Sequence, residues 1–98
     1  MSPHTGTTQF RFRMYVAGHT LNSTQAIANL TAICRDHLAE DYEIEVVDVF
    51  KHPERALVDG IMMTPTLLRL APSPAVRIVG SLSTKAVVLE ALEIPVQD

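Results

Sequence analysis

The chain has 98 residues, of which 47% are apolar and 19% are charged, and these values are typical of one globular domain with a single core. Its formal charge is -3 and it has no basic cluster, which argues against a nucleic-acid-binding protein. The single cysteine excludes an internal disulfide, a redox pair of cysteines and a cysteine-rich zinc site.

The two ends of the chain are expected to lie outside the folded domain. The N-terminal residues lack the basic and apolar regions of a signal peptide, and no apolar run is long enough to span a bilayer. We therefore expect a flexible arm at residues 1–9, one domain at residues 10–94 and a short tail at residues 95–98. The same features predict a cytoplasmic protein that does not associate with membranes.

The first half of the chain predicts a strand, a helix and a second strand. Residues 10–16 alternate bulky apolar and basic side chains before they become continuously apolar, as in a strand that is half exposed at its start. A helix with one apolar stripe is predicted to begin at a cap formed by Asn22 or Ser23 and to run to about Ala39. Residues 42–49 alternate and are rich in β-branched residues, so they predict a strand that a right-handed crossover reaches.

The second half predicts a short helix, a hairpin and a last helix. Residues 52–59 place Pro53 in a first helical turn, and Gly60 is suited to end that helix. Residues 66–70 and 76–79 predict two antiparallel strands around a proline-rich turn, and residues 83–93 predict a helix. The run at residues 87–89 suits a strand as well as a helix, so two topologies stay open for residues 50–94.

Pro65 stands between two threonines, where the short helix ends and the next strand begins. Proline lacks a backbone donor and moves the residue before it away from helical dihedral angles. The segment resembles the loop that carries a cis-proline in thioredoxin-like domains, which implies a cis Thr64–Pro65 bond, and the alternative is a trans proline that opens an edge strand. The order βαβαββα predicts a thioredoxin-like α/β fold, with a four-stranded mixed sheet and helices on both of its faces.

Enzyme chemistry has little support in the sequence. A thiol oxidoreductase carries its reactive thiolate before the first helix, but residues 18–23 contain no sulfur. Cys34 lies about three turns inside the helix on the apolar stripe, so we expect a buried structural thiol. Ser23 belongs to no nucleophile motif, and the histidines show no ligand spacing. We therefore predict no catalytic residue, cofactor or metal site.

Several motifs together resemble the KaiB family of small circadian-clock proteins, from about Arg13 to Leu92. The segments that carry the resemblance are Tyr15-Val16-Ala17-Gly18, Val47-Asp48-Val49, Thr64-Pro65-Thr66-Leu67 and Arg77-Ile78-Val79-Gly80. The resemblance implies a non-enzymatic protein that docks on a KaiC-like ATPase ring. In clock systems it also implies recruitment of KaiA or competition with a related histidine-kinase sensor domain.

The resemblance also implies a change of fold between a tetrameric ground state and a monomeric thioredoxin-like form, so a homo-oligomer, dimer or tetramer, is expected. The residues that we assign to the switching region are Gly80, Ser81, Ala91 and Glu93. The alternative function is a stand-alone sensor-like module for a histidine kinase.

Partner binding is expected at the open edge of the second strand, with help from the helix and loop that follow. The expected partner-binding residues are Glu43, Glu45, Val47, Asp48, Lys51, Arg69 and Arg77. Clock members usually carry basic residues on the second strand and often a glycine near the end of the last helix, whereas this chain has Glu43, Glu45 and Ala91. These departures favour a divergent member that acts in timing or stress adaptation.

Overall fold

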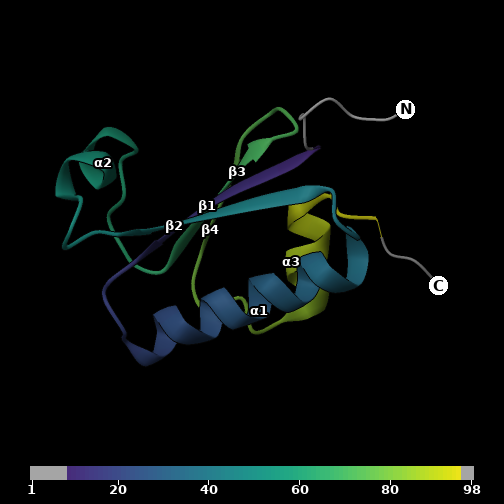
Figure 1. Ribbon diagram of the computed structural model, residues 1–98, viewed down its shortest axis with the longest axis horizontal. Coiled ribbons are helices and arrows are strands. Elements are labelled where there is room, and N and C mark those ends of the chain that lie inside the picture. Colours follow the sequence, from purple (N-terminus) through teal and green to yellow (C-terminus); the bar gives the residue numbers. More distant parts are fainter. Residues whose placement is uncertain (1–8, 96–98) are drawn as a thin grey trace.

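Seven elements follow one another in the predicted order, and the computed structural model describes them within residues 9–95 (Figure 1). The elements are β1 (Phe10–Val16), α1 (Leu21–His37), β2 (Tyr42–Asp48), α2 (Pro53–Val58), β3 (Thr66–Ala71), β4 (Val76–Val79) and α3 (Lys85–Leu92). The predicted α/β class and its order βαβαββα are thereby confirmed. The expected arm, apart from Gln9, and residues 96–98 of the expected tail lie outside the described residues.

The four strands form one sheet in the order β2-β1-β3-β4. β1 pairs with β2 in parallel and with β3 in antiparallel orientation, and β3 and β4 form the predicted antiparallel hairpin. The parallel pair needs a crossover connection, which α1 supplies. β2 and β4 are the two edge strands, so β2 lies at an edge as predicted.

The two faces of the sheet differ in how they are covered. Side chains at alternate positions of β1, such as Phe12 and Met14, are buried in the main core with residues of α1 and α3. The intervening positions Arg13 and Tyr15 point to the opposite face, where a smaller cluster includes Ala56 of α2. Figure 1 shows α1 and α3 together on one side of the strands and α2 apart from them. One face is therefore covered by two helices, and the other by one short helix.

The start of α1 differs from the prediction. The helix begins at Leu21, and its N-cap is Thr20, whose hydroxyl accepts a hydrogen bond from the backbone N–H of Ser23. Ser23 is buried inside the first turn, where its Oγ lies 2.8 Å from the hydroxyl of Thr20 and 3.2 Å from the backbone nitrogen of Ala17. The expectation that Asn22 or Ser23 caps the helix was wrong, because Thr20 precedes both residues and already accepts the hydrogen bond from the backbone N–H of Ser23.

The sequence left open whether residues 87–89 belong to a strand or to a helix, and in the structure they lie inside helix α3. The Thr64–Pro65 bond is cis, as the resemblance implied, and the bonds before Pro72 and Pro74 are cis too. Gly60 ends α2 with a positive φ of 67°, and Glu93 ends α3 in the left-handed region. Within residues 9–95, no helix is both long enough and apolar enough to cross a membrane.

Candidate functional site

The segment around α2 exposes large apolar side chains. Leu57 and Val58 of α2 are 82% and 85% exposed, and Met62 in the following loop is 91% exposed. We call the whole set the α2 surface, and its members are Phe50, Leu57, Val58, Met62 and Met63. Single exposed apolar residues are ordinary. Five of them within 14 residues of one chain lead us to treat this segment as the candidate surface for binding another protein.

Polar side chains attach α2 to the strands beneath it. Glu45 of β2 binds the Arg55 guanidinium through both carboxylate oxygens, at 2.8 and 3.0 Å, and also accepts a 2.8 Å hydrogen bond from Nε of Arg13. Asp59 accepts hydrogen bonds from the Tyr15 hydroxyl and from Nη1 of Arg13. We call these five residues, Arg13, Tyr15, Glu45, Arg55 and Asp59, the α2 tether.

The tether shifts the pKa values of its acidic members. Hydrogen bonds from Arg55 and then Arg13 lower the pKa of Glu45 from 4.5 to about 2. The hydrogen bond from Tyr15, followed by the one from Arg13, lowers the pKa of Asp59. Burial, followed by the contact with Asp59, raises the pKa of Tyr15. Both carboxylates are therefore ionised at neutral pH, and the tyrosine is protonated.

Arg77 of β4 contacts the C-terminal end of the same helix. Its guanidinium donates to the backbone carbonyls of Asp59, at 2.7 Å, and of Gly60, at 2.9 Å. Carbonyl groups at a helix C-terminus lack partners within the helix, and a cation there is favourable. α2 is thus contacted by side chains from both edge strands as well as from β1.

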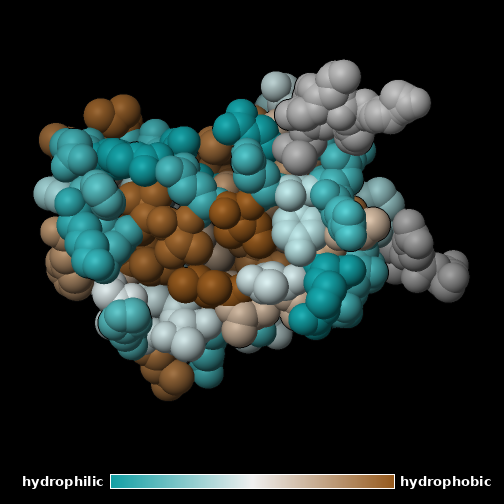
Figure 2. Space-filling model, viewed as in Figure 1, coloured by the Kyte–Doolittle hydropathy of each residue, from teal (hydrophilic) through white to brown (hydrophobic). Residues whose placement is uncertain are grey.

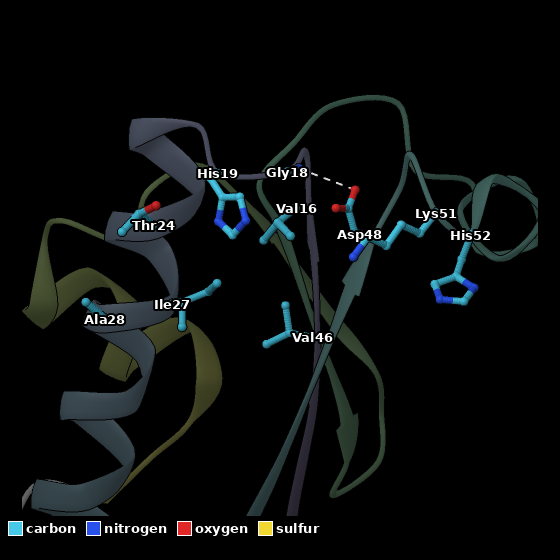
Figure 3. Close-up of a pocket in the computed structure, with 10 residues that line it drawn as sticks. All are labelled: Val16, Gly18, His19, Thr24, Ile27, Ala28, Val46, Asp48, Lys51 and His52. Carbon is cyan, nitrogen blue, oxygen red and sulfur yellow. Dashed lines mark hydrogen bonds between the residues drawn. The ribbon is translucent and has the colours of Figure 1, made fainter.

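A groove separates β2 from α1 on the other face of the sheet. Figure 2 shows an apolar patch in the middle of this view, where Figure 1 shows the space between α1 and the strands. The groove has a volume of about 550 Å³, and Figure 3 shows the side chains of Val16, Ile27 and Val46 at its apolar centre. Lys51 and His52 lie beyond the end of β2, at its polar rim.

Asp48 fixes the loops at this end of the sheet. Its Oδ1 accepts a hydrogen bond from the backbone N–H of Gly18, at 3.3 Å (Figure 3). The same oxygen accepts a second one from the backbone N–H of Phe50, at 2.9 Å. The carboxylate therefore joins the loop before α1 to the loop before α2. Asp48 holds the backbone that carries Phe50, a member of the α2 surface.

Two expected partner-binding residues are not at the surface. Val47 is buried with Tyr15 and Ala56 beneath α2, because the alternation of β2 places it on that covered face. Arg69 is fully buried on the opposite face, where its guanidinium donates to the backbone carbonyls of Leu92 and Pro74. Neither side chain is available to a partner in this fold, so the expectation is corrected for both.

The other expected residues lie on the face of the sheet that α2 partly covers or at the C-terminal end of β2. Glu43, Glu45 and Arg77 lie on the face that α2 partly covers, Asp48 is the last residue of β2, and Lys51 lies just beyond it. Glu43 and Glu45 are both paired with arginines of β1: Arg11 lies 3.1 Å from Glu43, and Arg13 lies 2.8 Å from Glu45. The arginines reduce the negative charge that these glutamates offer to a partner, so selection of a basic partner by them stays a prediction.

Sequence reasoning included the helix and loop after the second strand in the expected interface, but it did not name the residues of the α2 surface or most of the tether. One sequence feature could have indicated the surface: the adjacent apolar pairs Leu57-Val58 and Met62-Met63 flank Gly60 within a very short segment. A six-residue helix buries one narrow side, so two neighbouring apolar residues cannot both face the core. The tether has no comparable local pattern, since its members come from three separate elements.

The described part of the chain offers no evident reactive centre. Cys34 is fully buried in α1, where burial raises the pKa of its thiol to about 12, so the expected structural cysteine is confirmed. The loop before α1, where thiol oxidoreductases place their nucleophile, holds Gly18, His19 and Thr20. Across residues 9–95, no three His, Cys, Asp or Glu residues lie close enough to hold a metal ion.

The fold and site define a thioredoxin-like domain whose first loop lacks the redox cysteines. The chain is similar in fold to the N-terminal domain of SasA from Synechococcus elongatus, with a TM-score of 0.72 and 16% identity over 92% of this chain and 86% of that one. Mitochondrial thioredoxin 3 from Saccharomyces cerevisiae gives a TM-score of 0.70 and 15% identity over 89% of this chain and 80% of that one.

Sequence similarity assigns the family. The KaiB domain matches residues 13–94. The circadian clock protein KaiB3 of Synechocystis sp. is 43% identical over 82 residues, which cover 84% of this chain and 80% of that protein. The circadian clock oscillator protein KaiB of Rippkaea orientalis is 40% identical over 84% of this chain and 79% of its own length. The chain belongs to the KaiB family.

Proposed function

We propose that this protein binds a KaiC-type ATPase ring and modulates the timing or stress-related signalling of that ATPase, without catalysing a reaction itself. The observation that carries the proposal is the α2 surface, which exposes apolar side chains beside an edge strand. Burial of such side chains against a partner is favourable by roughly 25 cal/mol per Å² of apolar area. Relatives named as circadian clock proteins support a role in timing.

The edge of β2 supplies a second element of the proposed interface. Its unpaired backbone groups can bond to a strand of another protein, and this mode suits a KaiA-like or histidine-kinase partner. Glu43 lies along this edge, and Asp48 and Lys51 lie where it meets the loop to α2. In this proposal the ATPase uses mainly the α2 surface, and the additional partner uses mainly the strand edge.

We further propose that the thioredoxin-like form is the binding-competent one and that it exchanges with a second, oligomeric form, a dimer or tetramer, in the cytoplasm. Ala91 lies in the last turn of α3, the helix that would have to rearrange, and Gly80, Ser81 and Glu93 lie outside its two ends. Gly80 and Glu93 both have positive φ angles, which are uncommon for residues other than glycine and can change when a helix boundary moves.

The alternative function is a stand-alone sensor-like module that works with a histidine kinase. The fold shared with the N-terminal domain of SasA is compatible with it, but at 16% identity the similarity concerns the fold alone. The two functions differ in partner, because the first requires a KaiC-like ATPase encoded in the same genome.

A binding experiment with purified proteins tests the proposal. The full chain, immobilised through an N-terminal tag, is mixed with that KaiC-like ATPase in the presence of ATP, and the retained protein is measured. We expect the ATPase to be retained, and a histidine kinase from the same genome to be retained less. Retention of the kinase alone would favour the alternative, and retention of neither would contradict both functions.

A further inference from the structure

α2 is held against the sheet with little apolar packing. The helix has six residues, and isolated helices of that length are marginal in water, so its position depends on contacts with the rest of the protein. Within α2, Ala56 is the residue that is buried, in a small cluster with Tyr15, Val47 and Leu68. Apolar burial therefore secures α2 mainly through one methyl group.

The α2 tether supplies the contacts that apolar packing lacks. The bidentate pair of Arg55 with Glu45 fixes the first half of α2 to the edge strand, and two parallel hydrogen bonds fix the relative orientation of the two groups as well as their distance. Asp59 at the other end is fixed to β1 by Tyr15 and Arg13. Arg13 touches both carboxylates, so the two attachments form one network of two cations, two anions and a hydroxyl.

We propose that Arg13, Tyr15 and Glu45 are positioning residues for partner binding. They hold α2 in one orientation on the sheet, so that the α2 surface is already arranged when the partner arrives, and this inference rests on the proposed function. A preformed surface binds more tightly, because less conformational freedom is lost on association. The partner itself contacts the apolar side chains and not these three residues.

This arrangement makes an apolar interface sensitive to salt. The tether residues are partly exposed, with side-chain exposures of 24% for Arg13 and 45% for Glu45, so dissolved ions weaken their attraction. Salt then loosens α2 and lowers the fraction of molecules that present the surface, which lowers the apparent affinity in proportion. The partner's own charges need not contribute to this effect.

The chain contains a matched control for the tether. Arg11 and Glu43 are paired across the same two strands, two residues before Arg13 and Glu45, at a similar distance of 3.1 Å. Neither Arg11 nor Glu43 contacts α2 through a hydrogen bond or ion pair in the described part of the chain. Glu43→Gln and Glu45→Gln therefore remove the same charge from the same strand, but the second alone releases α2.

Amide hydrogen exchange measures how firmly α2 is held on the sheet, and it needs no partner. The reporting amides are those of Asp59 and Ile61, which donate to the carbonyls of Arg55 and Ala56. We expect exchange at both to be several-fold faster in Glu45→Gln than in the wild type and unchanged in Glu43→Gln. Tyr15→Phe is a conservative variant that removes one hydroxyl and keeps the buried ring, and it should likewise speed the exchange of these two amides. Equal exchange in Glu45→Gln and Glu43→Gln would overturn the proposal.

Binding is then measured with the purified KaiC-like ATPase at low and high NaCl. We expect Glu45→Gln to bind roughly fivefold more weakly than the wild type at low salt. Glu43→Gln, at a residue on the strand edge that the additional partner mainly uses, should lose clearly less affinity for the ATPase. Salt should weaken the wild type and Glu43→Gln but change Glu45→Gln much less. Identical affinities for the two variants would overturn the positioning role, whereas a wild type that does not bind the ATPase at all contradicts the proposed function instead.

Discussion

The guanidinium of Arg69 lies 2.6 Å from the backbone carbonyl oxygen of Leu92, which joins the middle of β3 to the last residue of α3. The same side chain donates to the carbonyl of Pro74 in the hairpin turn, also at 2.6 Å. A charged group is costly to bury unless hydrogen bonds compensate it, so a fully buried arginine marks a position where such bonds determine the local structure. Arg69 holds the end of α3 against the sheet.

We predict that Arg69→Met destabilises the protein by about 3 kcal/mol, because two buried carbonyl groups lose their charged donor while the side-chain volume is largely kept. Urea unfolding followed by circular dichroism measures the loss. Arg35→Met is the control, since Arg35 is exposed on α1 and is expected to change stability little. Equal stabilities of the two variants would show that the Arg69 contacts do not hold α3.

We predict that Cys34 reacts with a thiol reagent only when the native structure opens. Burial raises the pKa of the thiol from 9.0 to about 12, so the reactive thiolate is almost absent at neutral pH. The stabilising contribution of the neutral buried thiol is present below pH 9 and is lost as the pH rises toward 12. Labelling kinetics at pH 7.5 provide the check, and a rate close to that of the urea-unfolded chain would contradict the prediction.

The pKa of Glu45 predicts how stability changes in acid. Its folded value of about 2 lies below the unfolded value of 4.5, so its contribution is present above pH 4.5 and is lost as the pH falls toward 2. The stability difference between the wild type and Glu45→Gln should therefore shrink across this interval. Unfolding curves at several pH values measure it, with Glu43→Gln for comparison. A difference that stays constant from pH 6 to pH 2 would mean that the arginines do not hold Glu45 ionised.

The elements could be predicted because their signals are local. The alternation of residues 10–16 and the turn residues around 71–75 predicted β1 and β4 with the bounds that the structure has. Thr20 was missed as a helix cap because Asn22 and Ser23 are equally good capping types, and the choice depends on where the loop from β1 ends.

The site could not be predicted in the same way, because its contacts join distant positions. Arg13 and Glu45 are 32 residues apart, and only the register between β1 and β2 brings them together. Arg69 was expected at the surface because arginine is seldom buried, and its burial depends on acceptors that the end of α3 and the hairpin turn supply. Local patterns cannot reveal a partner that tertiary structure provides.

Ala91→Gly tests the proposed exchange between folds. Glycine disfavours a helix by roughly 1 kcal/mol relative to alanine, which is about a fivefold change in a two-state ratio. Ala91 is exposed near the end of α3, so the substitution should shift molecules toward the second form while removing no core contact. Size-exclusion chromatography and two-dimensional NMR should show a second species or a larger assembly.

Ala28→Gly provides the control for this exchange, because Ala28 is exposed in the middle of α1, which lies outside the switching region. It should lower stability by a similar amount and leave one set of NMR peaks. If Ala91→Gly likewise gives a single set of peaks at an unchanged size, the exchange does not occur under those conditions.

The affinity of the KaiC-like ATPase for two aspartate variants tests the proposed interface most directly. Val58→Asp places a charge in the α2 surface, whereas Val87→Asp places the same charge on α3, at a valine that is also well exposed. In fluorescence anisotropy titrations of the N-terminally labelled chain, we expect Val58→Asp to bind at least about tenfold more weakly and Val87→Asp to bind like the wild type. Unchanged affinity for Val58→Asp, or equal losses for the two variants, would contradict the α2 surface as the binding site.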